Sequence, residues 1–307
     1  MTQAPRALAF TLILAGLAAG CAEEHAPPPP KAPSLFVDCR GPASAAPTVI
    51  LESGAFGASA DWDLVQADLA KGGRVCAYDR AGIGRSPPRP GTKDAASIAR
   101  DLAGLLDQLG ERRPVILVGH SNGALYVETF AALYPQRVAG LVYVNGVTSN
   151  DLDYPLLIDD LTEERRLAGL ASVGGEIGLA PLIAHVLTEA TGLSGEAAQR
   201  KRYALEDPAT LSTANDEDQA VIPSLTATRR LGGVPARIPT VVICGSTDPE
   251  APLSQAWQAA EAAAAKRAAV KWILEAPGAT HTSPLVRDRS YVVAGVDWLR
   301  SFPRARF

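Results

Sequence analysis

The sequence predicts an α/β fold: a doubly wound, mostly parallel sheet with one helical insertion. The clearest strand is the apolar run at residues 115–118, which leads at once into a helical pattern at residues 125–134. Strand-like and helix-like segments alternate over residues 34–147 and again over residues 239–307, whereas the strand pattern stops between 148 and 238. Parallel strands need long crossover connections, which alternating helices supply. We therefore expect one sheet built from two stretches of chain.

The other expected elements follow from the spacing of apolar residues. Short apolar runs predict strands buried on both faces, and leucines at intervals of three and four predict amphipathic helices. Asp61 is the expected N-cap of the first helix, and Gly110 ends a helix over 98–109. Further strands are expected at residues 34–39, 48–52, 74–78, 138–144, 240–244 and 269–274, and later helices at about 252–265 and 290–300.

Residues 119–123 read Gly-His-Ser-Asn-Gly, directly between the 115–118 strand and a helix. A reversal from strand to helix within two or three residues strains the backbone at Ser121, and Gly119 and Gly123 remove the Cβ atoms that would clash. This pattern is typical of a nucleophile elbow, which places a serine hydroxyl above the strand ends, at the positive end of the next helix. The alternative is an ordinary glycine-rich turn.

Composition narrows the function classes. The 307 residues carry a net charge of −4 and are 47% hydrophobic, 20% charged and 6% aromatic. Such a chain suits one large α/β domain with an insertion, or two small domains. It lacks the basic surface and the aromatic stacking platforms of nucleic-acid-binding proteins. No His, Cys, Asp or Glu set has the spacing of a metal site, so we expect neither metal nor cofactor.

Residues 1–20 have the features of a signal peptide. Arg6 provides a basic start, and the apolar run at residues 7–19 is too short to span a membrane comfortably. The run ends in small residues before Cys21, which resembles a bacterial lipoprotein signal, where cleavage precedes a cysteine that is then lipidated. By the same resemblance, Ala22 in place of Asp favours the outer membrane. We expect an exported periplasmic or cell-surface lipoprotein; an ordinary secretory signal is the alternative.

Three motifs, in chain order, resemble those of the α/β-hydrolase superfamily, and most closely its small esterase-like members. They are the small-residue loop that follows Leu51, the Asp-Arg-Ala-Gly-Ile-Gly-Arg-Ser turn that begins at Asp79, and the elbow at Ser121. Many relatives have His where Ser53 stands and Gly where Ala124 stands, but neither change removes a catalytic group. The resemblance implies the α/β-hydrolase fold.

The resemblance also sets the expected domain organisation. It covers about residues 47–147 and 239–300, and relatives commonly carry a helical cap over the active site at the position of the insertion. The four consecutive prolines after residue 26 predict an extended tether, because proline runs favour polyproline II and pack no core. The expected parts are a signal peptide at 1–20, a Pro-rich tether at 21–33, a first core part at 34–147, a helical cap at 148–238 and a second core part at 239–307.

A serine hydroxyl is a poor nucleophile until a base accepts its proton. His281 follows the last predicted strand, where this fold places its base, and Asp248 follows the preceding strand. The order Ser121, Asp248, His281 is the α/β-hydrolase order of nucleophile, acid and base. Glu250 is the near alternative to Asp248. Some relatives carry the acid one strand earlier, but Asn145 stands there and cannot hold a negative charge.

Two backbone N–H groups are expected to stabilise an oxyanion near the serine. The amide of Asn122, at the start of the helix, is one; the other comes from the loop after Leu51, at Ala55 or alternatively at Phe56. Asp79 and Arg80 also follow a strand, and we expect them to fix their turn by hydrogen bonds.

The chain has four cysteines. With Cys21 assigned to lipid, export makes a disulfide possible among the other three. Cys39 and Cys76 lie in neighbouring predicted strands, and relatives of this type carry a similar pair, so we expect them to be bonded. Cys244, at the end of a buried strand, is then a free and inert thiol.

The resemblance implies a serine hydrolase with a Ser-His-Asp triad that cleaves a small carboxylic ester through an acyl-enzyme intermediate (EC 3.1.1). The same fold also hosts peptidases, lactonases, thioesterases, acyltransferases and perhydrolases, and fold does not decide among them. The nucleophile position is serine and not aspartate, which argues against epoxide hydrolase chemistry. A hypothesis from another class is a non-catalytic binding protein that keeps the cleft. The expected partners are an ester substrate and, through the lipid anchor, a membrane.

Overall fold

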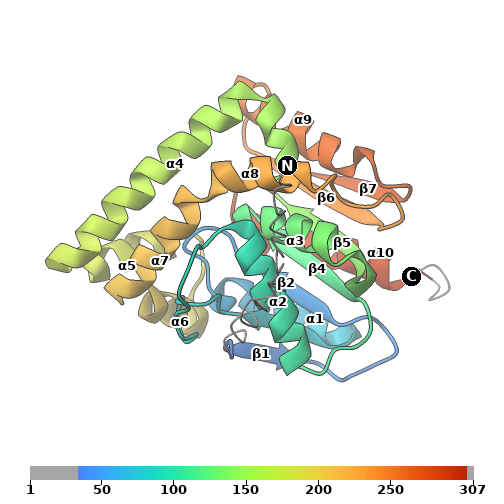
Figure 1. Cartoon of the computed structure of the whole chain (residues 1–307), viewed down its shortest axis with the longest axis horizontal. Coiled ribbons are helices and arrows are strands. Elements are labelled where there is room, and N and C mark those ends of the chain that lie inside the picture. The colour runs from blue at the N-terminus through green and yellow to red at the C-terminus, as the bar shows by residue number, and fades with distance from the viewer. Residues whose placement is uncertain (1–33, 303–307) are drawn as a thin grey trace, which may run out of the picture. The chain divides into compact units, whose positions relative to one another are not determined.

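The computed structural model describes residues 34–302, so the predicted signal peptide, Cys21 and the tether lie outside the described residues. A seven-stranded sheet with the order β1-β3-β2-β4-β5-β6-β7 forms the centre (Figure 1). Only β1 runs antiparallel within it. The strands are β1 (Val37–Arg40), β2 (Val49–Glu52), β3 (Val75–Tyr78), β4 (Val115–His120), β5 (Val138–Val144), β6 (Thr240–Ser246) and β7 (Lys271–Pro277).

Helices cover both faces of this sheet. On one face lie α2 (Ala95–Gln108), α3 (Asn122–Leu133) and α9 (Pro252–Lys266), and on the other lie α1 (Asp63–Leu69) and α10 (Ser290–Arg300). Strands alternate their side chains between these two layers. Leu117 of β4 thus packs towards α2 and α3, while Ile116 and Val118 pack towards α1 and α10. The predicted α/β fold class is confirmed.

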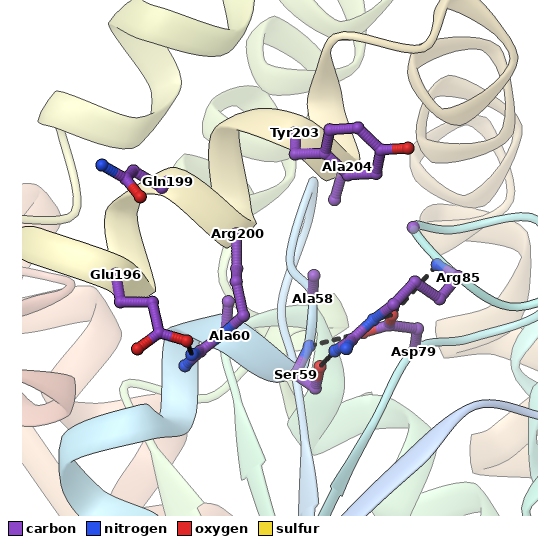
Figure 2. A pocket seen from close by; sticks show the side chains of 11 residues that line it. Ala58, Ser59, Ala60, Asp79, Arg85, Glu196, Gln199, Arg200, Tyr203 and Ala204 are labelled. Carbon is purple, nitrogen blue, oxygen red and sulfur yellow. Dashed lines mark hydrogen bonds and ion pairs between the residues drawn. The ribbon is translucent and has the colours of Figure 1, made fainter.

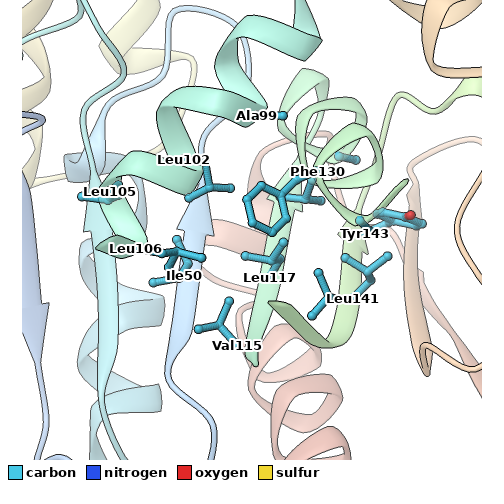
Figure 3. Packing of buried hydrophobic residues seen from close by; sticks show 14 of the residues in the cluster. Ile50, Ala99, Leu102, Leu105, Leu106, Val115, Leu117, Phe130, Leu141 and Tyr143 are labelled. Carbon is cyan, nitrogen blue, oxygen red and sulfur yellow. The ribbon is translucent and has the colours of Figure 1, made fainter. Parts of the chain in front are cut away.

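The α2–α3 layer forms the larger of the two cores (Figure 3). Leu102 and Leu106 of α2 and Phe130 of α3 meet Ile50 and Leu117 of the sheet, and all five are fully buried. Burying such side chains contributes about 1.5–3 kcal/mol each. This packing holds β2 and β4 side by side, which brings the loops after these two strands together.

Five helices lie between β5 and β6, and we refer to them as the cap helices. They are α4 (Pro155–Gly174), α5 (Ala180–Glu189), α6 (Gly195–Leu205), α7 (Pro208–Gln219) and α8 (Val221–Arg230). A short π-helix, η5 (Gly175–Leu179), joins α4 to α5. Helix α4 packs against α7, α5 against α6, and α8 against α3. Figure 1 shows them to one side of the sheet, with α4 forming an outer edge of the molecule.

Most sheet elements fall close to their predicted positions. The last strand, β7, begins at Lys271 and runs to Pro277 because its pairing with β6 continues to the end of both strands. The antiparallel register of β1 and β3 sets Cys39 opposite Cys76, and the two are joined by the predicted disulfide. Cys244 is buried and free, also as predicted.

Candidate active site

The turn from β4 to α3 has the geometry of a nucleophile elbow. Ser121 has φ 54° and ψ −127°, a conformation that L-residues rarely adopt. A Cβ on Gly119 would lie 2.5 Å from the carbonyl oxygen of Gly123, and one on Gly123 would lie 2.5 Å from the carbonyl oxygen of Glu52. The two glycines are therefore required by close backbone approach, as the sequence predicts. Within residues 34–302, the Ser121 hydroxyl has no hydrogen-bond partner.

The loop after β2 lies directly against the serine. A Cβ on Gly54 would come within 2.8 Å of the Cβ of Ser121. Phe56, two residues on, has a positive φ of 50°. The backbone N–H groups of Ala55, Phe56 and Asn122 donate no hydrogen bond to any described residue. Unpaired N–H groups on two sides of a nucleophile are the donors that an oxyanion hole needs.

Arg80 holds this loop in place. Its buried guanidinium donates to the carbonyl oxygens of Ser53 (2.6 Å) and Gly54 (2.9 Å) and to the carboxylate of Glu52 (2.8 Å). It also forms a two-bonded pair with Glu217 of cap helix α7, at 3.0 and 2.8 Å. All the ionised groups are at most 3% exposed. Arg80 therefore connects the sheet, the candidate oxyanion loop and the cap, a wider role than the predicted turn.

Asp79, the neighbour of Arg80, has the predicted turn-fixing role. Its carboxylate accepts hydrogen bonds from the backbone N–H groups of Ser59 (2.8 Å) and Arg85 (3.1 Å). Asp79 therefore ties the loops after β2 and β3 together.

His281 lies in the loop after β7, beside the elbow. Its ring centroid is 4.8 Å from that of His120, the residue before the serine. The Nε2 atom of His120 lies 2.9 Å from the carbonyl oxygen of His281, and the Asn145 side chain donates to the same oxygen at 2.9 Å. The structure therefore brings His281 and the elbow together, with His120 as the contact between them. No pattern in the sequence indicated this role of His120.

Both imidazoles favour the neutral form. Burial, together with the nearby His281, lowers the pKa of His120 to about 3. The surrounding protein also lowers the pKa of His281, while the negative charge of Asp160, on α4, opposes that shift. A neutral imidazole can accept a proton, so His281 is suited to act as a base at neutral pH.

Asn145, directly after β5, connects the end of β6 to the loop that follows β7. Its backbone has a positive φ of 44°. The side-chain oxygen accepts from the N–H of Gly245 (2.7 Å), and the side-chain NH₂ donates to His281. An amide can accept on one side and donate on the other, which a carboxylate cannot do. Asn145 therefore positions the histidine loop by hydrogen bonds.

Asp248 lies in the loop after β6, as the sequence predicts, but it is exposed and has no contact with His281 in the described structure. One carboxylate oxygen accepts from the backbone N–H of Glu250 at 3.2 Å. Glu250 is exposed as well. The role of Asp248 as the triad acid stays a prediction.

A cavity of about 260 Å³ opens beside His281, between the loops and helices α4 and α9. His281 and Trp257 line it together with three carboxylates, Asp160, Glu164 and Glu261. Burial raises the pKa of Glu164 to about 7, with help from the charge of Asp160, and burial alone raises that of Glu261 to about 7. The cavity wall next to the candidate base is therefore lined by carboxyl groups, two of which are only partly ionised at neutral pH.

Cap helix α7 closes over the serine. The Asn122 side chain donates to Asp218 at 2.8 Å, and Ser121 is 7% exposed. Burial raises the pKa of Asp218 to about 8, and the charges of Glu217 and Glu164 add to the shift. Asp218 is therefore mostly protonated at neutral pH, which spares the site a second buried charge beside Glu217.

A second pocket, of about 320 Å³, lies between the loop after β2 and helix α6 (Figure 2). Asp79, Arg85, Arg200 and Tyr203 are among the residues that line it, but none of the predicted catalytic residues is. Figure 2 shows that Arg85 bonds within its wall to Asp79 and Ser59. Among residues 34–302, no group of His, Cys, Asp and Glu side chains could hold a metal ion.

The sequence profile of the α/β hydrolase fold family matches residues 47–279. This match covers well over half of the chain, so the chain belongs to that family. Curated relatives are similar over a shorter stretch. An AB hydrolase superfamily protein of Gibberella zeae is 38% identical over 36% of each chain. A putative carbamate hydrolase RutD of Variovorax paradoxus is 42% identical over 36% of this chain and 42% of its own length. The matched stretch thus spans about two fifths of such relatives.

Solved structures are similar over most of the chain. An esterase from Thermogutta terrifontis is 25% identical, with a TM-score of 0.63, and the match covers 87% of this chain and 93% of the esterase. A laboratory-evolved variant of potato epoxide hydrolase has a TM-score of 0.72 at 17% identity, over 89% and 97% of the two chains. Because the epoxide hydrolase variant is only 17% identical, its similarity shows that the two proteins share a fold and nothing more.

Proposed function

We propose that this protein is a serine hydrolase that cleaves small carboxylic esters through an acyl-enzyme. The observation that carries the proposal is the strained backbone of Ser121, pressed against a loop that presents unpaired N–H groups. Such strain has a cost of about 1–3 kcal/mol and persists where the surrounding structure enforces it. The position of His281 beside the elbow and its lowered pKa support the same chemistry.

In the proposed reaction, the Ser121 oxygen attacks the ester carbonyl while His281 accepts the hydroxyl proton. The negative oxygen of the tetrahedral intermediate receives hydrogen bonds from the N–H of Asn122 and from that of Ala55, or alternatively Phe56; each such donor lowers the barrier by about 3 kcal/mol. His281 then gives its proton to the departing alcohol. A water next attacks the acyl-enzyme while His281 accepts the water's proton, and His281 returns that proton to the Ser121 oxygen as the carboxylic acid product leaves.

Asp248 is the proposed third member of the triad. In this role its carboxylate orients the imidazole of His281 and stabilises the imidazolium that forms. Asp248 is exposed, and among residues 34–302 its carboxylate accepts a hydrogen bond only from the backbone N–H of Glu250. The proposal therefore requires its loop to move towards His281 during the reaction.

The serine at the elbow favours acyl transfer over epoxide opening. Attack of a serine oxygen on an epoxide would leave an ether on the enzyme, which water does not readily cleave, whereas an acylated serine is an ester that water can hydrolyse. A carbamate is a second candidate substrate, because several relatives are named putative carbamate hydrolases. Its carbonyl could be attacked by the same groups.

A panel of p-nitrophenyl esters of increasing acyl length, with a matched p-nitrophenyl carbamate, tests the proposal. We expect turnover of the short esters by the full chain and none by Ser121→Ala. Equal turnover by the wild type and Ser121→Ala would defeat the serine mechanism. Faster turnover of the carbamate than of every ester would favour the second candidate, and no turnover by a folded wild type would favour a binding protein.

We also propose that the protein is an exported lipoprotein, lipidated at Cys21 and anchored in the outer membrane. The support is the sequence alone: an apolar run at residues 7–19, small residues before Cys21, and a Pro-rich tether. Replacement of Cys21 by Ser in a Gram-negative host should move the protein out of the membrane fraction. An unchanged distribution would favour an ordinary secretory signal or another mode of attachment.

A further inference from the structure

The second half of α4 and helix α5 bury several small side chains and expose several large ones, whereas Leu157 and Leu161 in the first half of α4 are buried. On their inner sides lie Ala168 and Ser172 of α4 and Ala180, Ala184 and Thr188 of α5. The outward side chains are six large aliphatic ones, each between 52% and 72% exposed: Leu167, Leu170, Val173, Ile177, Leu182 and Val186. We refer to these six residues as the apolar tip. A helix at the surface of a globular protein normally shows the opposite arrangement.

The apolar tip forms one continuous surface. Leu167, Leu170 and Val173 recur at intervals of three along α4, and Leu182 and Val186 are four apart on α5, so each set lies on one helix face. The two helices contact each other, and Ile177 lies in the π-helix between them. Between Leu167 and Leu187 the sequence has a single charged residue, Glu176. Figure 1 shows this junction at an outer corner of the molecule, away from the sheet.

This surface needs a partner to cover it. The segment Pro155–Glu189 has a mean hydropathy of 1.6 over its most apolar 18 residues, which is as apolar as a membrane-spanning helix. Only 33% of the residues in that window are buried within the protein, so most of them lie partly or fully at its surface. Contiguous exposed apolar surface of this kind marks sites that bind a protein or a membrane.

We propose that the apolar tip inserts into the surface of a lipid bilayer, so that the cap faces the membrane. The proposal rests in part on the lipid anchor proposed above. Thirteen residues separate the described domain from residue 20, a length of chain that spans about 40 Å when it is extended as polyproline II, and a domain of this size is about 45–50 Å across. Such a tether lets the domain turn until its most apolar surface meets the membrane to which it is attached.

A second copy of the chain fits the tip less well. A stable interface of ordinary size uses about 20–30 residues on each side, whereas the tip offers six large side chains at a corner. Insertion into a bilayer needs no complementary protein surface. Because the tip carries no cationic side chain, its insertion depends on apolar burial and should proceed on neutral lipids, with little dependence on salt.

The test uses the full chain with Cys21→Ser, so that no acyl chain masks the contribution of the tip. It is mixed with phosphatidylcholine vesicles at low and high salt. The variant Leu170→Gln/Ile177→Gln/Val186→Gln should lower the vesicle partition coefficient by at least about tenfold. The matched control is Leu231→Gln, which removes an aliphatic side chain of 44% exposure at the end of α8. This variant should change the vesicle partition coefficient less than twofold.

A depth probe makes the test independent of the N-terminal segment. Ile177→Trp should be quenched by lipids that carry a spin label on the acyl chain, whereas Leu231→Trp should not. Equal quenching at the two positions, or a partition coefficient that the triple variant leaves unchanged, would overturn the proposal. A dimer in solution that the triple variant dissociates, without vesicle binding by the wild type, would assign the tip to a second copy instead.

Hydrolysis of a short soluble ester separates this proposal from the proposed activity. The triple variant alters none of the groups placed at the candidate active site, so its turnover in the absence of vesicles should equal that of the wild type. Loss of turnover in the triple variant alone would mean that the tip supports the folded cap, which contradicts a surface that is free to bind lipid.

Discussion

The sheet and the cap helices differ in which side chains they bury and which they expose. In the sheet, the strand residues next to the elbow are completely buried and the positions of Ser121, Gly119 and Gly123 follow from close backbone contacts. In the cap, the second half of α4 and helix α5 expose several large aliphatic side chains, among them Leu170 and Val186. The sheet fixes the candidate catalytic groups by backbone geometry, whereas the cap covers them and carries an apolar tip to the outside.

The contact between these two regions combines apolar packing, in which Leu161 and Leu225 of the cap meet Leu125 of α3, with buried polar pairs. Arg80, in the loop after β3, pairs with Glu217 of α7, and the Asn122 side chain donates to Asp218 of the same helix. Buried polar contacts are specific in direction, but they stabilise less than apolar packing of the same volume. The comparison indicates that the candidate catalytic groups and the helices that cover them are built separately, and the five predictions below test that division in order of expected effect.

Replacement of His281 by Gln should have the largest effect, because it removes the proposed base. We expect kcat/KM for a short p-nitrophenyl ester to fall by about 10⁴-fold with the folded structure intact. His120→Gln is the matched control, since it lies beside His281 without a proposed proton-transfer role, and its loss should be far smaller. A greater loss in His120→Gln would mean that the wrong imidazole has been assigned as the base.

Asp248→Asn and Asp160→Asn ask whether the sheet or the cap supplies the acid. If Asp248 orients His281, kcat should fall by about 10²–10⁴-fold in Asp248→Asn and by less than tenfold in Asp160→Asn. The measurement is steady-state kinetics at one pH for both variants. The reverse pattern would assign the acid to α4 and break the division between catalytic sheet and covering cap.

Arg80→Met should destabilise the folded protein by about 3–5 kcal/mol, because it leaves Glu52 and Glu217 buried without their cation. Urea unfolding measures the change. Glu217→Gln keeps the volume and breaks only the bond to the cap, so its cost should be smaller. Equal costs for the two variants would show that the Arg80 contacts to the β2 loop contribute nothing.

The pH profile should give the smallest but most specific effect. The neutral form of His281 is the proposed base, so activity is lost as pH falls through its pKa, which lies below 6.5. Because the charge of Asp160 raises that pKa, Asp160→Asn should move the acid limb to still lower pH. An acid limb above pH 6.5, or one that Asp160→Asn moves upwards, would contradict this reading of the site.

Asp218 should make the folding stability of the protein depend on pH as well. With a pKa of about 8, against about 4 when unfolded, it binds a proton only in the folded state between those two values. Its contribution to stability is therefore lost as pH rises from about 4 to about 8. Asp218→Asn should reduce that slope, as thermal unfolding across the pH range would reveal.

Much of the sheet and the elbow could be predicted because their signals are local. The apolar run at residues 115–118 and the glycines on either side of Ser121 lie within ten residues of one another. The strand that precedes His281 could also be predicted, because its apolar residues are close together in the sequence. Predicting the partner of Cys39 also needed the pairing of β1 with β3 and the resemblance to relatives.

The parts that sequence missed depend on residues far apart in the chain. Arg80 and Glu217 are 137 positions apart, and no spacing rule joins them. His120 and His281 meet because two loops end at one edge of the sheet. Leucine spacing indicated helices between residues 148 and 238, but it did not reveal that the small side chains would face inwards. That preference is set by how closely α4 and α5 approach their neighbours.

The central claim is that Ser121 is a nucleophile activated by its position at the elbow. A fluorophosphonate probe forms a covalent bond with such a serine, and peptide mass spectrometry locates the adduct. The account predicts one adduct, on the peptide that contains Ser121, and its loss in Ser121→Ala and in His281→Gln. A folded wild-type protein that remains unlabelled, or that is labelled at another residue, would contradict it.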